Sequence, residues 1–248
     1  MRPIKKQAAG ISVSYMSSDG NTVTASISHT YSPYSDAKYP LIGCVGQYCS
    51  YCEMEKEPGD LAVEHVAAKS RGGASTAWDN FLLACNICNS VKGSQLLNLQ
   101  DCHWPHVNNT YLCFIYDASG RVHVNPALSG LSKDRATKLY EICKLGRHPH
   151  TGDVPSSSDF RWKKRFETWN LATRDKNLYQ QGTFSIDDVI SDALRTGFWS
   201  VWFTVFKGED AVRCRLIDSF PGTDAKCFDP DNHYEPINRN PDDTNDPI

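Results

Sequence analysis

Two pairs of cysteines are the residues of this sequence most able to do chemistry. Cys49 and Cys52 form one C-x-x-C pair, and Cys85 and Cys88 form a matching pair further along the chain. Four thiolates in paired knuckles suit a closed tetrahedral zinc site. Zinc would hold together the two ends of a loop-rich segment that a small core cannot stabilise alone. The pattern therefore predicts a structural zinc site rather than a redox dithiol.

A second set of polar residues lies between the two pairs and just after them. Glu64 and His65 follow a strand-like apolar run, Asn80 comes before the second pair, and Asn89 and Lys92 follow it. Taken singly, these residues would be a surface Glu-His dipeptide, a turn residue, a helix cap and a solvated lysine. Their position relative to the four cysteines favours a shared role in catalysis.

This arrangement resembles the zinc-bearing branch of the HNH endonuclease family. The resemblance rests on the lead-in Glu-His-Val, the Gly-Gly loop, Asn-Phe-Leu-Leu and the run Cys-x-x-Cys-Asn-x-x-Lys-Gly. It implies a ββα-metal fold, in which two strands and a helix surround one divalent ion. In that family the acid before the histidine and the third motif residue hold the ion, which assigns Mg²⁺ or Mn²⁺ to Glu64 and Asn89. Glu64 stands where an aspartate is common.

The same resemblance implies roles for the other three residues. His65 would take a proton from water for in-line attack on a phosphodiester. Asn80 would brace the loop that orients the histidine, and Lys92, about one helical turn after Asn89, could meet a phosphate oxygen. The substrate would be DNA or RNA, because such a site contacts mainly one phosphate and its sugar.

Beyond this motif, the sequence is similar to the HNH subunit of Septu-type and retron-associated anti-phage systems. The similarity covers MRPI at the start, YCSYCE, WDNFLLAC, WPH and NTY, and GFWSVWFTVF with RLIDSFPGT near the end. It implies an ABC-type ATPase as the partner subunit, a retron RNA/DNA element as a further partner, and phage or host nucleic acid as the substrate.

Composition indicates an ordinary globular protein of 248 residues with a net charge of −3. Residues 223–248 hold seven acids against two basic residues, so the remaining chain is slightly basic. The start, MRPIKKQAAG, lacks an apolar signal region, and the apolar run at 198–206 is too short to cross a membrane. We therefore expect a cytoplasmic protein with no membrane association, and the similarity to anti-phage systems implies a bacterial one. Reduced cysteines outside the two pairs are expected as core or surface residues.

We expect an α+β protein in three parts: an N-terminal arm (1–43), the zinc-stapled ββα-metal HNH nuclease unit (44–100), and a mostly helical region (101–248). The arm should contain a strand at 23–28, and a short helix is expected within 35–46. A hairpin is expected at 110–117 and 121–126. Helices should follow Ser132, Ser158 or Asp159, and Ser185, with another at 208–222. The acidic end of the chain is expected to be extended or disordered.

Several alternatives stay open. The chain could be a non-catalytic zinc ribbon that binds nucleic acid or a partner, or a stand-alone HNH nuclease of the restriction or homing type. The run at 102–106 reads as a structural loop or a second metal cluster, and the basic run at 161–165 as a phosphate-binding face or a solvated helix. We expect the N-terminal arm, the C-terminal helices and the apolar segment 198–206 to dock the partner, the alternative being a second core.

Overall fold

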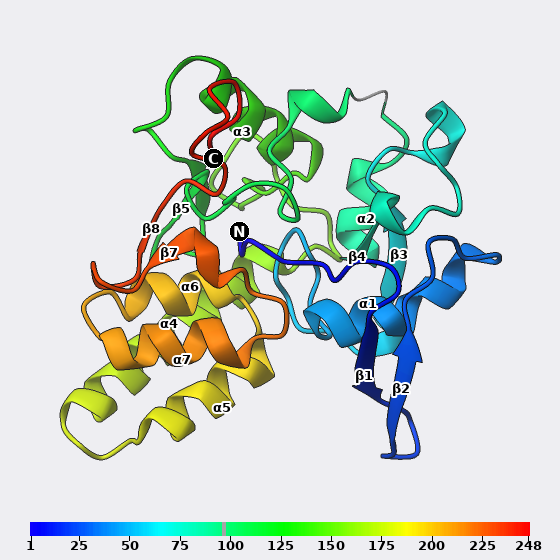
Figure 1. Cartoon of the computed structure of the whole chain (residues 1–248). Coiled ribbons are helices and arrows are strands. Elements are labelled where there is room, and N and C mark those ends of the chain that lie inside the picture. The colour runs from blue at the N-terminus through cyan, green and yellow to red at the C-terminus, as the bar shows by residue number, and fades with distance from the viewer. Residues whose placement is uncertain (96–97) are drawn as a thin grey trace.

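Small two-stranded sheets and seven α-helices make up the part of the chain that the computed structural model describes, residues 1–95 and 98–248 (Figure 1). Each sheet is antiparallel. The sheets pair β1 (Ser12–Met16) with β2 (Thr22–Ser26), β3 (Leu61–His65) with β4 (Phe81–Cys85), β5 (Phe114–Tyr116) with β6 (Val122–Val124), and β7 (Phe228–Asp229) with β8 (Glu235–Pro236). This confirms the mixed class expected from the sequence.

The helices fall into two groups. In Figure 1, α4 to α7 pack together, while α1 and α2 lie beside the β1–β4 region. The helices are α1 (Lys38–Val45), α2 (Asn86–Lys92), α3 (Gly130–Ile142), α4 (Arg161–Gln180), α5 (Ile186–Thr196), α6 (Trp199–Val205) and α7 (Asp210–Ser219). In the described residues, no helix combines the length and the apolar character that crossing a membrane requires.

Two hydrophobic cores correspond to these groups. One gathers side chains from α1, β3, β4, the four paired cysteines, β5 and α3. The other gathers side chains from α5, α6 and α7 with Ala172 of α4. The cores meet at α6, where Val201 belongs to the first and Trp202 to the second.

The segment 198–206 is a buried element of this second core. Trp199, Trp202, Phe203 and Phe206 are at most 1 % exposed, and Trp199 stacks on Phe203 with ring centroids 4.5 Å apart. Side chains enclosed in this way cannot meet a partner. The prediction that this aromatic segment docks another protein is therefore wrong. The alternative of a second core is confirmed for these four side chains, but that core is not self-contained, because Phe198 and Val201 of the same segment belong to the first core.

Local signals placed most of the helices correctly. Ser185 caps α5 in a capping box with Asp188, as the Ser-x-x-Asp sequence predicts. Helix α3 begins earlier than expected, with Ser129 instead of Ser132 at the N-cap position and without a side-chain capping hydrogen bond, and α4 begins after Phe160. The hairpin at 110–126 is present as β5 and β6. The expected strand near 23–28 pairs with β1, which the sequence analysis did not predict.

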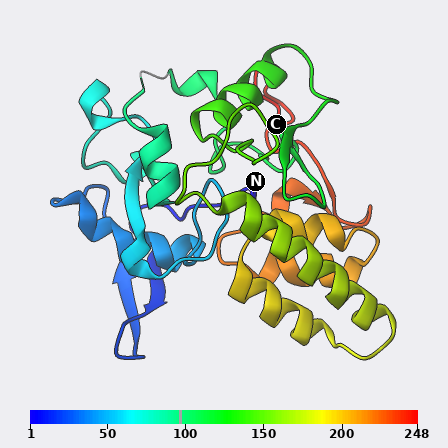
Figure 2. The ribbon, with the colours of Figure 1, turned by 180° about the vertical axis from the view of Figure 1, so that it is seen from behind.

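Both ends of the chain pack into the molecule, as the N and C marks in Figure 2 also indicate. Met1 and Ile4 are buried, and the Ile4 N–H donates to the carbonyl of Pro105 at 2.7 Å. Ile248 is also buried, and its carbonyl accepts from the Asn108 amide at 2.9 Å. Of the two expectations for the acidic end, extended or disordered, the extended one holds: residues 237–248 form no helix or strand, and Ile248 packs into the first core.

Candidate active site and zinc centre

The β3–β4 hairpin and α2 carry most of the residues predicted to act in chemistry. Strand β4 is buried along its whole length, and it leads directly into α2 through Cys85. The Cys85 sulfur accepts the backbone N–H of Cys88 at 3.5 Å, which caps the first turn of α2. One residue therefore ends the strand, begins the helix and contributes a thiol.

The four paired cysteines come together in one cluster. Their sulfur atoms all lie within 4.8 Å of one another, and the Cys52 and Cys85 sulfurs are 3.7 Å apart. Tetrahedral Zn–S bonds of about 2.3 Å place neighbouring sulfurs about 3.8 Å apart, so this spacing fits zinc. Hydrogen bonds among the cysteine sulfurs, those with Cys49 first, lower the pKa of Cys85 and raise the pKa of Cys52 and Cys88, so these groups titrate as one unit and Cys85 is the sulfur most favoured as a thiolate. The cluster has the donor set and the dimensions of a structural zinc site.

His65, at the end of β3, has a fixed ring and one engaged nitrogen. Its Nε2 lies 3.0 Å from the carbonyl oxygen of Ser75. A carbonyl only accepts, so Nε2 carries the proton and Nδ1 keeps its lone pair in the neutral ring. The ring also makes edge contacts with Phe81 (5.0 Å between centroids) and Tyr34 (4.8 Å).

Asn80 holds the loop that presents this carbonyl. Its Oδ1 accepts from the Ala67 N–H at 2.7 Å, and its Nδ2 donates to the carbonyls of Ala67 and Ala74, both at 2.9 Å. Gly73 permits the loop to close, because a Cβ there would lie 1.9 Å from the Ala67 oxygen. The loop 67–74 is thus tied at both ends to one buried amide, and Ser75 follows directly after it.

The Glu64 side chain is buried, and its carboxylate contacts the polar ends of Lys92 and Tyr51. One carboxylate oxygen lies 2.6 Å from the Lys92 ammonium, and the other accepts from the Tyr51 hydroxyl at 2.6 Å. Lys92 also donates to the carbonyl of His65 at 2.9 Å. Burial, and then the Glu64 charge, raise the pKa of Tyr51 well above its ordinary value, so its hydroxyl stays a donor. All three side chains are at most 4 % exposed.

This placement bears on the roles expected for Lys92 and for the second metal. The Lys92 ammonium is 1 % exposed and already engaged, so it would have to leave Glu64 to reach a phosphate. Asn89 lies exposed on α2, whereas Glu64 is buried. Among the described residues, the four cysteines are the one group of three or more Cys, His, Asp or Glu side chains placed to hold a metal. Glu64 would therefore have to exchange Lys92 or Tyr51 for the ion if it were to hold Mg²⁺ or Mn²⁺ together with Asn89.

Two other motifs have structural explanations. Of the run 102–106, Cys102 and His103 are buried, and the His103 ring lies between the Ser132 carbonyl and Asp246. In the basic run 161–165, Arg161 and Arg165 are 2 % exposed and donate to backbone carbonyls. The structural-loop interpretation of 102–106 is therefore supported, and half of the basic run is unavailable to phosphate.

Sequence reasoning missed three residues that shape the site: Tyr34 beside His65, Tyr51 beside Glu64, and Arg161 beside Cys88. Tyr34 lies in the segment taken as an arm, and Arg161 lies 73 positions from the cysteine it contacts. Tyr51 sits inside the first C-x-x-C pair, where its hydroxyl partner is set by the fold. No local spacing marks such contacts.

A comparison with protein families found a match in this region of the chain. Residues 49–95 match the family model described as HNH endonuclease. The match begins at the first paired cysteine and includes the second pair, His65 and Asn80. No curated protein matches the chain. The HNH family suggests an endonuclease that acts on nucleic acid.

Proposed function

We propose that this chain is an HNH endonuclease that hydrolyses phosphodiester bonds in DNA or RNA. The observation that carries the proposal is His65, whose Nε2 is bound to the Ser75 carbonyl while Nδ1 keeps its lone pair. A histidine with a fixed ring and a free basic nitrogen is suited to general-base catalysis. It lies within the segment that matches the HNH endonuclease family.

In this mechanism, Nδ1 of His65 takes a proton from the water that attacks phosphorus. The imidazolium that forms is stabilised because Nε2–H already donates to the Ser75 carbonyl. Asn80 keeps that carbonyl in place through its bonds to Ala67 and Ala74. Orientation of the base by a preorganised second group is the usual arrangement for an activated nucleophile.

The two proposed metals have different support. Zinc at Cys49, Cys52, Cys85 and Cys88 would join the start of α2 to the 49–52 turn, and the sulfur positions fit it. The family resemblance assigns Mg²⁺ or Mn²⁺ to Glu64 and Asn89, and such an ion would stabilise negative charge on a phosphate. Because Glu64 is paired with Lys92, we route no step of cleavage through this ion.

The test is cleavage of plasmid DNA and of tRNA by purified protein, with Mg²⁺, with Mn²⁺ and without either. His65→Ala should lower the cleavage rate by about 10²- to 10⁴-fold while leaving the fold and the zinc content intact. His123→Ala, at an exposed histidine of the β5–β6 hairpin, is the matched control. Wild-type turnover by His65→Ala would remove the histidine from the mechanism.

A non-catalytic zinc module is the second candidate. It is favoured by the burial of Glu64 against Lys92 and Tyr51, which engages both oxygens of the Glu64 carboxylate. A binding module of this kind would hold nucleic acid or a partner protein with its zinc intact and would leave every substrate uncut. Binding without cleavage under all three metal conditions would support this candidate.

The biological setting that we propose rests on the resemblance to Septu-type and retron-associated systems. In that setting the chain is the cytoplasmic effector of a bacterial anti-phage complex, held by an ABC-type ATPase and, in retron systems, by an RNA/DNA element. Purification together with a co-expressed ATPase of this class tests the proposal. A chain that purifies alone and cleaves without the ATPase would favour a stand-alone nuclease.

A further inference from the structure

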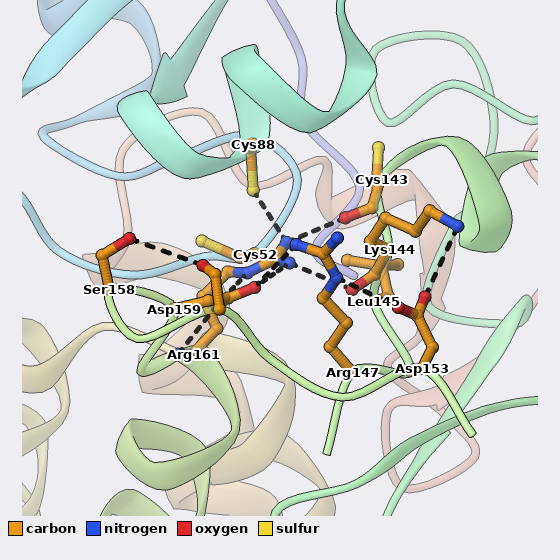
Figure 3. A network of polar contacts seen from close by, with 12 residues as sticks. Cys52, Cys88, Cys143, Lys144, Leu145, Arg147, Asp153, Ser158, Asp159 and Arg161 are labelled. Atoms are coloured by element: carbon orange, nitrogen blue, oxygen red, sulfur yellow. Dashed lines mark hydrogen bonds and ion pairs between the residues drawn. The ribbon is translucent and has the colours of Figure 1, made fainter. Parts of the chain in front are cut away.

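Arg161 reaches the cysteine cluster from a part of the chain that lies outside the family match. It is the first residue of α4, and its Nη1 lies 3.3 Å from the Cys88 sulfur. Figure 3 shows its guanidinium between Cys88 on one side and the turn at 143–145 on the other. The side chain is 2 % exposed, so this contact is fully removed from solvent.

Each N–H of this guanidinium has a partner. Nε and Nη2 bind the two carboxylate oxygens of Asp159 at 2.8 and 2.7 Å. Nη1 also donates to the Cys143 carbonyl at 2.8 Å, and Nη2 to the Lys144 carbonyl at 3.0 Å. With the Cys88 sulfur, these contacts use all five donors of an arginine. The Arg161 guanidinium is therefore held in one orientation, which keeps Nη1 beside the Cys88 sulfur.

The net charge of a zinc-loaded cysteine cluster explains why an arginine is favourable at this position. Four thiolates around one Zn²⁺ leave a net negative charge, and all four cysteines are at most 4 % exposed. Burying unbalanced charge is unfavourable, so an adjacent cation stabilises it. Arg161 shares its charge between Asp159 and the cluster, and it donates a hydrogen bond to one of the ligand atoms. Hydrogen bonds from neighbouring groups to metal ligands commonly tune metal affinity.

We propose that Arg161 is a positioning residue of the zinc centre that couples zinc binding to the packing of the helical region. This inference rests on the zinc site of the proposed function. When zinc holds the four sulfurs together, the Cys88 sulfur is fixed beside Nη1 of Arg161, and the same guanidinium holds the carbonyls of the 143–145 turn. When zinc leaves, the Cys88 sulfur is no longer held at this position, so the 143–145 turn and the start of α4 loosen, although they contain no zinc ligand.

The prediction is tested by two measurements on the full chain. Hydrogen exchange of wild-type protein, with zinc and after chelation, should show lost protection at 143–147 and 159–165 as well as in α2. Zinc release to a chromogenic chelator should be about 10- to 100-fold faster in Arg161→Met than in wild type. Arg161→Lys, which keeps the charge but not the fork, should fall between the two.

Arg165→Met is the matched control. Arg165 lies one turn along α4, is also 2 % exposed, and donates to the carbonyls of Gly120 and Leu145 without a sulfur contact. It reports the effect of losing a buried arginine from this helix. Zinc release from Arg161→Met at the rate of Arg165→Met overturns the inference.

The remaining outcomes are also decisive. If Arg161→Met does not fold, the wild-type exchange data decide, and unchanged protection at 143–147 after chelation overturns the coupling. A wild-type protein that neither carries nor takes up zinc overturns the zinc site and the inference with it. Neither measurement depends on cleavage, so failure of the nuclease proposal would be seen separately.

Discussion

His65 owes its orientation to three neighbours from different parts of the chain. The Ser75 carbonyl binds Nε2, Phe81 packs edge-on to the ring, and Tyr34 covers another side of it. Tyr34 also lies 4.7 Å from the Lys69 ammonium, measured to its ring centroid. The proposed general base is therefore held by aromatic contacts that lie partly outside the segment matching the HNH family model.

Removal of the Tyr34 ring should lower kcat more than it changes KM. An aromatic pair contributes about 0.5–1.5 kcal/mol, so loss of ring orientation in Tyr34→Ala should slow cleavage by roughly 2- to 10-fold. Tyr34→Phe keeps the ring and should cleave normally. Tyr39→Ala is the control, because Tyr39 is similarly exposed but stacks on Tyr15. Equal rates for the two alanine variants would contradict a positioning role for Tyr34.

The Glu64–Lys92 pair makes a prediction about stability. Breaking a buried ion pair from one side typically costs about 3–5 kcal/mol, because the remaining charge is left uncompensated. Lys92→Met should therefore lower the free energy of unfolding by about that amount in urea titrations. Adding Glu64→Gln should recover much of the loss, since a neutral amide can still accept from Tyr51.

Lys163→Met serves as the control for this prediction. Lys163 pairs with Glu167 at 3.9 Å on an exposed helix face, where ion pairs are worth about 0–1 kcal/mol. If Lys92→Met were as stable as this control and only bound substrate more weakly, the phosphate-binding role expected from the sequence would be favoured.

The elements of the HNH unit are individually too small to be stable. A lone two-stranded sheet is marginal in water, and α2 spans only Asn86–Lys92. The cysteine cluster joins the end of β4 and the start of α2 to the 49–52 turn. The hairpin and the helix can therefore persist together where neither would alone.

Loss of one thiolate should unfold this unit. Cys49→Ser, or chelation of the wild type, should abolish protection of β3, β4 and α2 in hydrogen exchange, because the binding energy of a structural metal is also folding energy. Cys214→Ser is the control, since Cys214 is outside the cluster and partly exposed. Metal analysis should find one zinc per wild-type chain. A folded, zinc-free wild-type sample would exclude this account.

The elements that sequence predicted well are those with strong local signals. Ser185 and Asp188 predict the start of α5, and the apolar run at 198–206 predicts a buried element. Strand β1 does alternate in burial, with Val13 buried and Tyr15 half-buried, but it was missed because these are only two inward-facing residues in a stretch of five. Glu64, His65 and Asn80 were identified as candidates, but their partners Tyr51, Tyr34 and Ala67 are determined by tertiary packing that spacing cannot reveal.

At the scale of the whole molecule, the two ends of the chain meet at the loop 104–108. The Pro105 carbonyl accepts from the Ile4 N–H at 2.7 Å and from Arg239 at 3.2 Å. The next residue, His106, is held among these segments, with Lys6 and Arg239 as cationic neighbours. Burial, and then these two charges, lower the pKa of His106 to about 3.

This histidine makes stability depend on pH. In the unfolded chain His106 takes up a proton near its ordinary pKa of about 6.5, whereas in the folded protein it takes up this proton only near pH 3. The unfolded state therefore binds more protons in this window, so the free energy of unfolding falls as the pH drops below about 6.5. For one group the slope approaches about 1.4 kcal/mol per pH unit.

Urea titrations between pH 7.5 and about pH 5 should show this loss in the wild type, and His106→Gln should show a shallower slope. His123→Gln changes the same side chain at an exposed position and should retain the wild-type slope. Parallel slopes for the wild type and His106→Gln would mean that other groups control acid stability and that the junction of the two chain ends does not.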